Sequence, residues 1–445
     1  RPPRSREPRS RALRMTQPGP LVAAAGFSFH GLLRPGDHIV CGQAAAEPLT
    51  LTRKLVAEGP GVAEATVFLG ATMTRTFDGP LPASLRFLSY GTLGHNASLA
   101  DRGLLEVLPD RYSRIAPLFR SGQLRADVVL LQLAPGPAGR RPSLGLAHDY
   151  CVDAARRARL VVAELNPDVP WTHGAELPPD LRIDHWVQAE AGPLALPAAA
   201  GSEVELAIGR HVAGLVPDGA TLQAGFGSLP DALFLQLRQH RDLGLHSGVF
   251  GDAAALLVQQ GALTNARKGM DAGVSVTNTV IGTADLYRWV HDNPGVQVRP
   301  GTSTHAPEVL ARMHCLHAVN GALQVDLTGQ VNSEAVGGRQ RGGIGGLLDF
   351  CQAARQSDSG GRAITVLPAT AEGGRRSRIV VDLDGPATVG RADVDVVVTE
   401  FGVADLRHAT LGQRAERLIA IAAPAFRNSL RHAWRLSTWG QRAWH

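Results

Sequence analysis

Short apolar runs separated by helical patterns organise most of the chain. Runs rich in Val, Ile and Leu predict strands over residues 65–69, 128–133, 160–164, 364–367 and 394–399. Apolar positions at helical spacing predict helices over 154–159, 230–238 and 411–422. Strands that are apolar on both faces and alternate with helices form parallel sheets covered on both sides. The pattern therefore predicts an α/β fold.

One strand signal occurs twice. The segment from Leu33 to Gly42 reads LRPGDHIVCG, a turn followed by a short buried strand and a glycine at which the chain bends away. The segment from Leu215 to Gly225, LVPDGATLQAG, repeats this order with one extra residue between the proline and the final glycine. The repetition predicts two related halves, each with its own parallel-rich open sheet covered by helices.

Length agrees with this division. A chain of 445 residues exceeds the size at which one hydrophobic core usually keeps growing. A Pro/Ala/Gly-rich stretch at 192–201 marks the expected boundary. We predict a basic tail over 1–20, an N-terminal α/β domain over 21–200, and a C-terminal α/β domain over 201–445.

Composition narrows the class of protein. Hydrophobic residues make up 44% and charged residues 19%, which fits a folded α/β protein and not a disordered or fibrous one. No apolar run reaches the roughly 18 residues that a membrane-spanning helix needs, so we expect a cytoplasmic protein without a membrane partner. The four cysteines have no CxxC spacing, and we expect reduced thiols.

The net charge of +5 is concentrated at one end. Six arginines lie between Arg1 and Arg14, and the remainder of the chain is nearly neutral. Such an arm could touch acidic polymers, but a run of like charges is more often a solvated tail. We exclude it from the fold and expect no nucleic-acid partner.

The first glycine loop lies in QAGFGSLPDA, residues 223–232, where a predicted strand leads into a helix that Pro230 can begin at its first turn. Free backbone N–H groups in such a turn can hold an anion or a developing oxyanion. A dinucleotide-binding fingerprint needs a third glycine where Pro230 stands, and a plain tight turn is the alternative. The candidate binding residues here are Gly225, Phe226, Gly227, Ser228 and Leu229.

Two later loops have a similar composition. Residues 337–350 read GGRQRGGIGGLLDF and combine six glycines with two arginines just before a predicted helix, which favours a phosphorylated or carboxylate ligand over a simple turn. The pair Gly345 and Gly346 lies in this loop. A second pair, Gly373 and Gly374, precedes three arginines, and a solvated basic turn is the alternative there.

Several common chemistries are absent from the sequence. No HExxH, P-loop or GxSxG pattern occurs, and the sixteen histidines lack metal-binding spacing, so we expect no metal site. Lys54 and Lys268 are the only lysines, which leaves little basis for Schiff-base chemistry.

The order of these motifs, over roughly residues 30 to 430, resembles the acetyl-CoA hydrolase/CoA-transferase family, which includes 4-hydroxybutyrate and acetate CoA-transferases. Besides the glycine loops at Gly225 and Gly342, the resemblance rests on several short segments. These are DVVLLQ (127–132), SLG (143–145), NPDVPWTHG (166–174), LTN (263–265), VDLTGQVNSE (325–334), SRI (377–379) and TEFGVADLR (399–407).

The resemblance implies covalent catalysis by a glutamate that attacks the acyl-CoA carbonyl and passes CoA to a second carboxylate. The matching segment, LHSGVFGD (245–252), has Gly248 where the family has that glutamate. The family's CoA and oxyanion contacts map onto the residues from Gly225 to Leu229, onto Gly345 and Gly346, and onto Gly373 and Gly374.

Three functions are compatible with these residues. The first is a hydrolase or CoA-transferase that acts on short-chain acyl-CoA and small carboxylic acids, with coenzyme A as substrate, no tightly bound cofactor, and Glu334 as the base for water. Glu334 could equally serve only to tie its loop down. The second is a catalytically inert acyl-CoA-binding paralogue, and the third is a sugar-phosphate or nucleotide-handling protein. The chain could also form a homodimer or a larger homo-oligomer.

Overall fold

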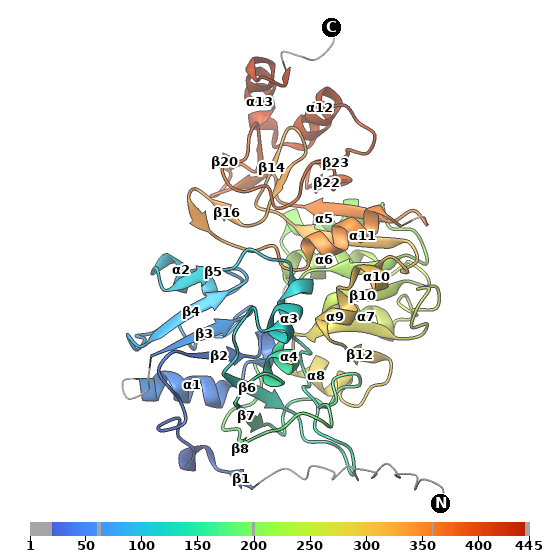
Figure 1. The fold of residues 1–445 in the computed structure, drawn as a ribbon. Helices are drawn as coiled ribbons and strands as arrows, with labels where there is room; N and C mark the ends of the chain where they lie inside the picture. Colours follow the sequence, from blue (N-terminus) through green and yellow to red (C-terminus); the bar gives the residue numbers. More distant parts are fainter. Residues whose placement is uncertain (1–19, 60–63, 198–200, 358, 441–445) are drawn as a thin grey trace, which may run out of the picture.

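The computed structural model describes residues 20–59, 64–197, 201–357 and 359–440, and two eight-stranded sheets dominate it (Figure 1). All but the last residue of the predicted basic tail lies outside the described residues. The fold class predicted from the sequence, parallel-rich sheets covered by helices, is confirmed.

The first sheet uses strands from the first half of the chain, and all of its strand pairs are parallel. Its order is β1 (Leu21–Val22), β8 (His185–Gln188), β7 (Leu160–Leu165), β6 (Val128–Leu133), β2 (Asp37–Cys41), β3 (Ala65–Leu69), β4 (Leu85–Ser89) and β5 (Leu105–Val107). All six residues of β6 are buried, as expected for a strand covered on both faces.

The second sheet is parallel except for its last pair. Its order is β12 (Val296–Val298), β11 (Ser275–Val280), β10 (Gly244–Phe250), β9 (Thr221–Ala224), β13 (Leu316–Gly321), β18 (Arg362–Val366), β22 (Val396–Thr399) and β23 (Gly402–Asp405). Three small sheets join β15 (Val331–Asn332), β14 (Gln324–Asp326) and β21 (Ile379–Val380), then β16 (Ala335–Val336) and β17 (Arg339–Gln340), then β19 (Thr370–Ala371) and β20 (Arg376–Ser377).

Helices connect the strands and cover the sheets. In the first half they are α1 (Leu49–Glu58), α2 (Asn96–Asp101), α3 (Tyr112–Ser121) and α4 (Cys151–Ala155), with 3-10 turns η1 (Ala24–Gly26) and η2 (Ala44–Ala46). In the second half they are α5 (Glu203–Ala213), α6 (Ser228–Gln236), α7 (Asp252–Gln259), α8 (Ala284–Val290), α9 (Gly301–Thr304), α10 (Pro307–Leu310), α11 (Leu347–Arg355), α12 (Leu411–Ile421) and α13 (Pro424–Leu436).

Local sequence explains several helix ends. Ser202 and Glu205 form a capping box that begins α5, and Thr410 and Gln413 do the same for α12. The predicted start of a helix at Pro230 was wrong by two residues, because α6 begins at Ser228. A proline within the first turn costs no helical hydrogen bond, so the helix can start before it.

The two strands that carry the repeated segment, β2 and β9, occupy equivalent places in the two sheets. From β2 the chain adds strands in one direction and later returns to add β6 on the other side. From β9 it does the same, with β13 on the other side. Ligands of open α/β sheets bind outside the carboxyl ends of the strands at such a reversal point. Each half therefore offers one site, at β2/β6 and at β9/β13.

The two halves meet along these carboxyl ends. The glycine loop before α11 reaches the first half, where Thr92 N donates to Gly342 O at 2.9 Å and Tyr112 N donates to Gly345 O at 2.9 Å. One hydrophobic cluster contains side chains from strands of both sheets. In Figure 1, α3 lies where the two sheets approach each other.

The described residues also bear on the expectations for membrane spans, metal sites and cysteines. No helix among them is long and apolar enough to cross a bilayer. No group of three His, Cys, Asp or Glu side chains in the same residues is arranged to hold a metal ion. All four cysteines are buried and free, as predicted.

Candidate functional site

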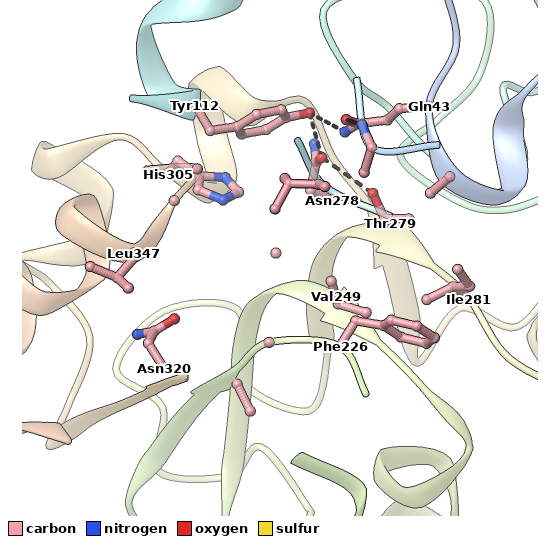
Figure 2. Close-up of a pocket in the computed structure, with 18 of the residues that line it drawn as sticks. Gln43, Tyr112, Phe226, Val249, Asn278, Thr279, Ile281, His305, Asn320 and Leu347 are labelled. Carbon is pink, nitrogen blue, oxygen red and sulfur yellow. Dashed lines mark hydrogen bonds between the residues drawn. The ribbon is translucent and has the colours of Figure 1, made fainter. Parts of the chain in front are cut away.

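A cavity of about 540 Å³ lies between the halves, at the carboxyl ends of both sheets. Residues that follow β2, β3 and β4 form one wall, and residues at the ends of β9, β10, β11 and β13 form the other. Figure 2 shows side chains from both walls around the cavity. The polar and glycine residues that line it are Gln43, Tyr90, Gly94, Tyr112, Gln223, Gly225, Gly248, Asn278, Thr279, His305, Asn320, Gly345 and Gly346.

The structure brings together part of the set that the sequence predicted. Two members of the first loop, Gly225 and Phe226, line the cavity together with Gly345 and Gly346 of the second loop. The other members of the first loop border an adjoining apolar hollow of about 220 Å³, which shares Gly225 and Phe226 with the main cavity; they are Gly227, Ser228 and Leu229.

Two predicted features lie elsewhere. Gly373 and Gly374 form the turn between β19 and β20 and are not among the residues that line the cavity. Glu334 is buried, and its carboxylate accepts a hydrogen bond from Thr388 Oγ1 at 2.8 Å. Its side chain is also outside the lining of the cavity.

Gly248 lies on β10 in the wall of the cavity. Its backbone is outside the left-handed region, so a residue with a side chain can adopt the same conformation. A Cβ atom there would point at the imidazole of His305, 3.2 Å from Nε2 and 3.4 Å from Cε1. The glycine thus lets β10 pack close to that ring, and a side chain at 248 would require the ring to shift slightly.

His305 follows α9 and is only 4% exposed. The rings of Tyr112 and Phe350 contact it edge-on, with centroids 4.8 Å and 4.9 Å away, and Thr304 Oγ1 lies 2.8 Å from its Nδ1. Burial, with a smaller contribution from the nearby His246, lowers the pKa of His305 to about 3. The imidazole is therefore neutral at physiological pH.

A chain of hydrogen bonds links the two walls (Figure 2). Tyr90 Oη donates to Gln43 Oε1 at 2.6 Å, Gln43 Nε2 donates to Tyr112 Oη at 2.9 Å, and Tyr112 Oη donates to Asn278 Oδ1 at 2.7 Å. Burial raises the pKa of both tyrosines, so they stay neutral. Asn278 is fixed in turn by the carbonyls of His148 and Arg299.

No Asp, Glu, Lys or Arg is among the residues that line the cavity. Charged ligand groups would therefore be costly inside it, whereas a neutral thioester or amide fits. The glycines let the backbone approach such a ligand closely. The arrangement suits a reaction that starts from a neutral carbonyl and develops charge only in the transition state.

Sequence reasoning missed most of the polar wall. Gln43 directly follows Gly42, the glycine at which the first repeated segment was predicted to bend, so its place after a strand could have been predicted from the sequence. Tyr90, Tyr112, Asn278 and His305 carry no motif. They come together only through the packing of the two halves.

Known proteins resemble this chain in sequence. Residues 282–434 match the family described as the acetyl-CoA hydrolase/transferase C-terminal domain. The 4-hydroxybutyrate coenzyme A transferase of Clostridium kluyveri is 38% identical over 339 residues, which cover 76% of this chain and 79% of that protein.

Solved structures show the same fold. RipA from Yersinia pestis superimposes with a TM-score of 0.85 at 29% identity and covers 92% of this chain and 95% of its own. The 4-hydroxybutyrate CoA-transferase from Porphyromonas gingivalis gives a TM-score of 0.74 at 32% identity, with 91% and 94% covered.

Proposed function

This chain belongs to the acetyl-CoA hydrolase/transferase family, and from that membership we propose that it acts on the thioester of short-chain acyl-CoA. The reaction is either hydrolysis or transfer of CoA to a small carboxylic acid. The observation that carries the proposal is the cavity at the reversal points of both sheets, bordered by Gly225 and Gly346 and free of charged side chains.

The glycine at position 248 favours hydrolysis over transfer. A glycine cannot form the mixed anhydride through which a glutamate would take up CoA. No other carboxylate lines the cavity, so water is the available nucleophile. Glu334 as the base for that water stays a prediction, and it requires the carboxylate to leave Thr388 and turn toward the cavity.

The main alternative is an inert acyl-CoA-binding protein. The same absence of a carboxylate from the cavity lining favours it, because binding needs the glycine backbone but not a nucleophile. The contributions of Gly373, Gly374 and nearby arginines to CoA binding, a homo-oligomeric state and a cytoplasmic location also stay predictions.

Two measurements separate these functions. Calorimetry with CoA, acetyl-CoA and butyryl-CoA should show binding, and free thiol should then be released from the acyl-CoAs at a steady rate. Binding without release would establish the inert alternative. Absence of binding at low ionic strength would contradict both, and direct binding of a nucleotide or a sugar phosphate would then identify the third function.

A further inference from the structure

We propose that His305 is the catalytic base of this protein and that it activates a water molecule in the cavity that it lines together with Gly248. The inference rests on the proposed function, since it assumes that the cavity holds a thioester. It assigns the base role to a residue that no motif indicates.

The first support is the fit between the imidazole and two glycines. A Cβ atom at position 346 would lie 2.5 Å from Cδ2 and 2.6 Å from Nε2 of His305, so a side chain there would displace the buried ring. At position 248 the same distance to Nε2 is 3.2 Å. Gly248 on β10 and Gly346 in the glycine loop therefore let two backbone segments pack close to Nε2, which holds the ring in the wall of the cavity.

The second support is the tautomer. Thr304 Oγ1 lies 2.8 Å from His305 Nδ1 and can also donate to Pro300 O at 3.4 Å. Both bonds form at once only if Nδ1–H donates to the hydroxyl and the hydroxyl donates to the carbonyl. Nε2 then carries the lone pair. No described residue supplies a hydrogen bond to Nε2, so a water molecule or a substrate can.

The third support is the chemistry of the lining. Among the residues that line the cavity, His305 is the one whose side chain carries a basic nitrogen, and no carboxylate competes with it. The titratable groups that face it are Tyr112 from α3 and His246 from β10. Burial raises the pKa of Tyr112 and lowers that of His246 to about 4, so both are neutral near pH 7.

The reaction step balances without a further reactant. Nε2 takes a proton from water as the water oxygen attacks the thioester carbonyl, and the carbon–sulfur bond breaks when the tetrahedral intermediate collapses. The imidazolium then gives its proton to the departing thiolate. The products are a carboxylic acid and free CoA. Transient charge on the ring is compensated by the oxyanion and the thiolate next to it.

The test compares variants by their rate of thiol release from acetyl-CoA. His305→Gln should lower kcat/KM at least about 100-fold, the range for loss of a general base, with CoA affinity changed only a few-fold. In His305→Ala, added imidazole should restore part of the rate. The matched control is His317→Gln, which changes a buried histidine of β13 that lies outside the cavity and should retain the wild-type rate.

The pH profile supplies a second readout. Because burial lowers the pKa of His305 to about 3, kcat/KM of the wild type should be level from about pH 5 to about pH 8 and should fall at lower pH as the imidazole gains a proton. An acid limb that is unchanged in His305→Gln would contradict the inference.

Other results separate the two proposals. A fully active His305→Gln protein would overturn the role of His305 without contradicting the proposed hydrolase activity. Loss of activity in Glu334→Gln in the same assay would assign the base role to Glu334 instead. A wild-type protein that binds CoA but releases none from any acyl-CoA would overturn both.

Discussion

The carboxyl ends of the two sheets differ in what they present to the shared cavity. In the first half, Gln43, Tyr90 and Tyr112 close a chain of hydrogen bonds that leaves these side chains little freedom. In the second half, Gly248 and Gly346 present bare backbone close to the buried imidazole of His305. The first half thus provides a fixed polar wall, and the second provides the surface at which chemistry can take place.

The largest expected effect comes from adding the missing carboxylate to the second half. Gly248→Glu should raise CoA transfer to acetate roughly 100-fold or more and yield a glutamyl-CoA adduct, because the backbone at 248 accepts a side chain. His305 would have to shift by a few tenths of an ångström to admit it. Gly248→Gln is the matched control, since it fills the same space without a nucleophile. Equal transfer by the two folded variants would contradict the prediction.

The next largest expected effect is on the stability of the first half and involves the buried carboxyl group of Glu164, which lies outside the cavity lining. Glu164, at the end of β7, accepts from Thr50 N and Leu51 N, while its Oε1 and the Oε1 of the neighbouring Gln132 have no described partner. Burial raises the pKa of Glu164 to about 7. Protonated Glu164 can donate to Gln132 and satisfy both oxygens.

The sign of the resulting pH dependence follows from that pKa. Between about pH 4.5 and 7 the folded state holds a proton that the unfolded state has released, so stability falls as pH rises through this window. Glu164→Gln carries an amide that donates to Gln132 at every pH. Its free energy of unfolding relative to wild type should therefore increase with pH, by up to about 3 kcal/mol at about pH 8. Urea unfolding at both ends of the window measures this, and a difference that does not change with pH would refute it.

A smaller loss is expected where the two halves join. Tyr112→Phe removes a hydroxyl that accepts from Gln43 and donates to Asn278, so the free energy of unfolding should fall by about 1 to 3 kcal/mol. Tyr90→Phe removes one bond within the first half and should cost less. Thermal unfolding measures the loss of stability in each variant. An equal or larger loss in Tyr90→Phe would show that the hydrogen bonds of Tyr112 between the two halves contribute no more than the bond within the first half.

The smallest expected effect is on CoA affinity. The arginines of the glycine loops should assist at the phosphates, so affinity should weaken a few-fold from low to high ionic strength. Arg339→Ala should reduce this salt dependence, and Arg34→Ala, in the first half before β2, serves as the control. Calorimetry at two salt concentrations gives the comparison, and an unchanged affinity would exclude a phosphate contact by these arginines.

Much of the fold was predictable because it depends on local pattern. The run of six buried residues in β6 was placed at 128–133 from its composition alone, and the repeated segment gave both central strands, β2 and β9. The loops at Gly225 and Gly345, which line the cavity, were also visible in the sequence as glycine clusters, the first after a predicted strand and the second before a predicted helix. The loop on which Gly346 lies needed no tertiary information, whereas β10, the strand that carries Gly248, was not predicted as a strand.

The polar part of the cavity was not predictable in the same way. His305 follows a four-residue helix, and what distinguishes it is the pair of glycines that lie 57 and 41 residues away in the chain. Tyr112 meets Asn278 across the two halves, 166 residues apart. Such contacts arise from packing between sheets, and neither periodicity nor spacing along one strand records them.

The central claim is that this protein turns over acyl-CoA without an enzyme-bound glutamyl-CoA. Its most direct test follows thiol release from acetyl-CoA while borohydride reduction and intact-mass measurement search the same sample for a covalent adduct. The account predicts steady release with the 245–252 peptide unmodified and no adduct on any carboxylate. Rapid, ping-pong transfer of CoA to acetate with an adduct trapped on Glu334 or another carboxylate would contradict it.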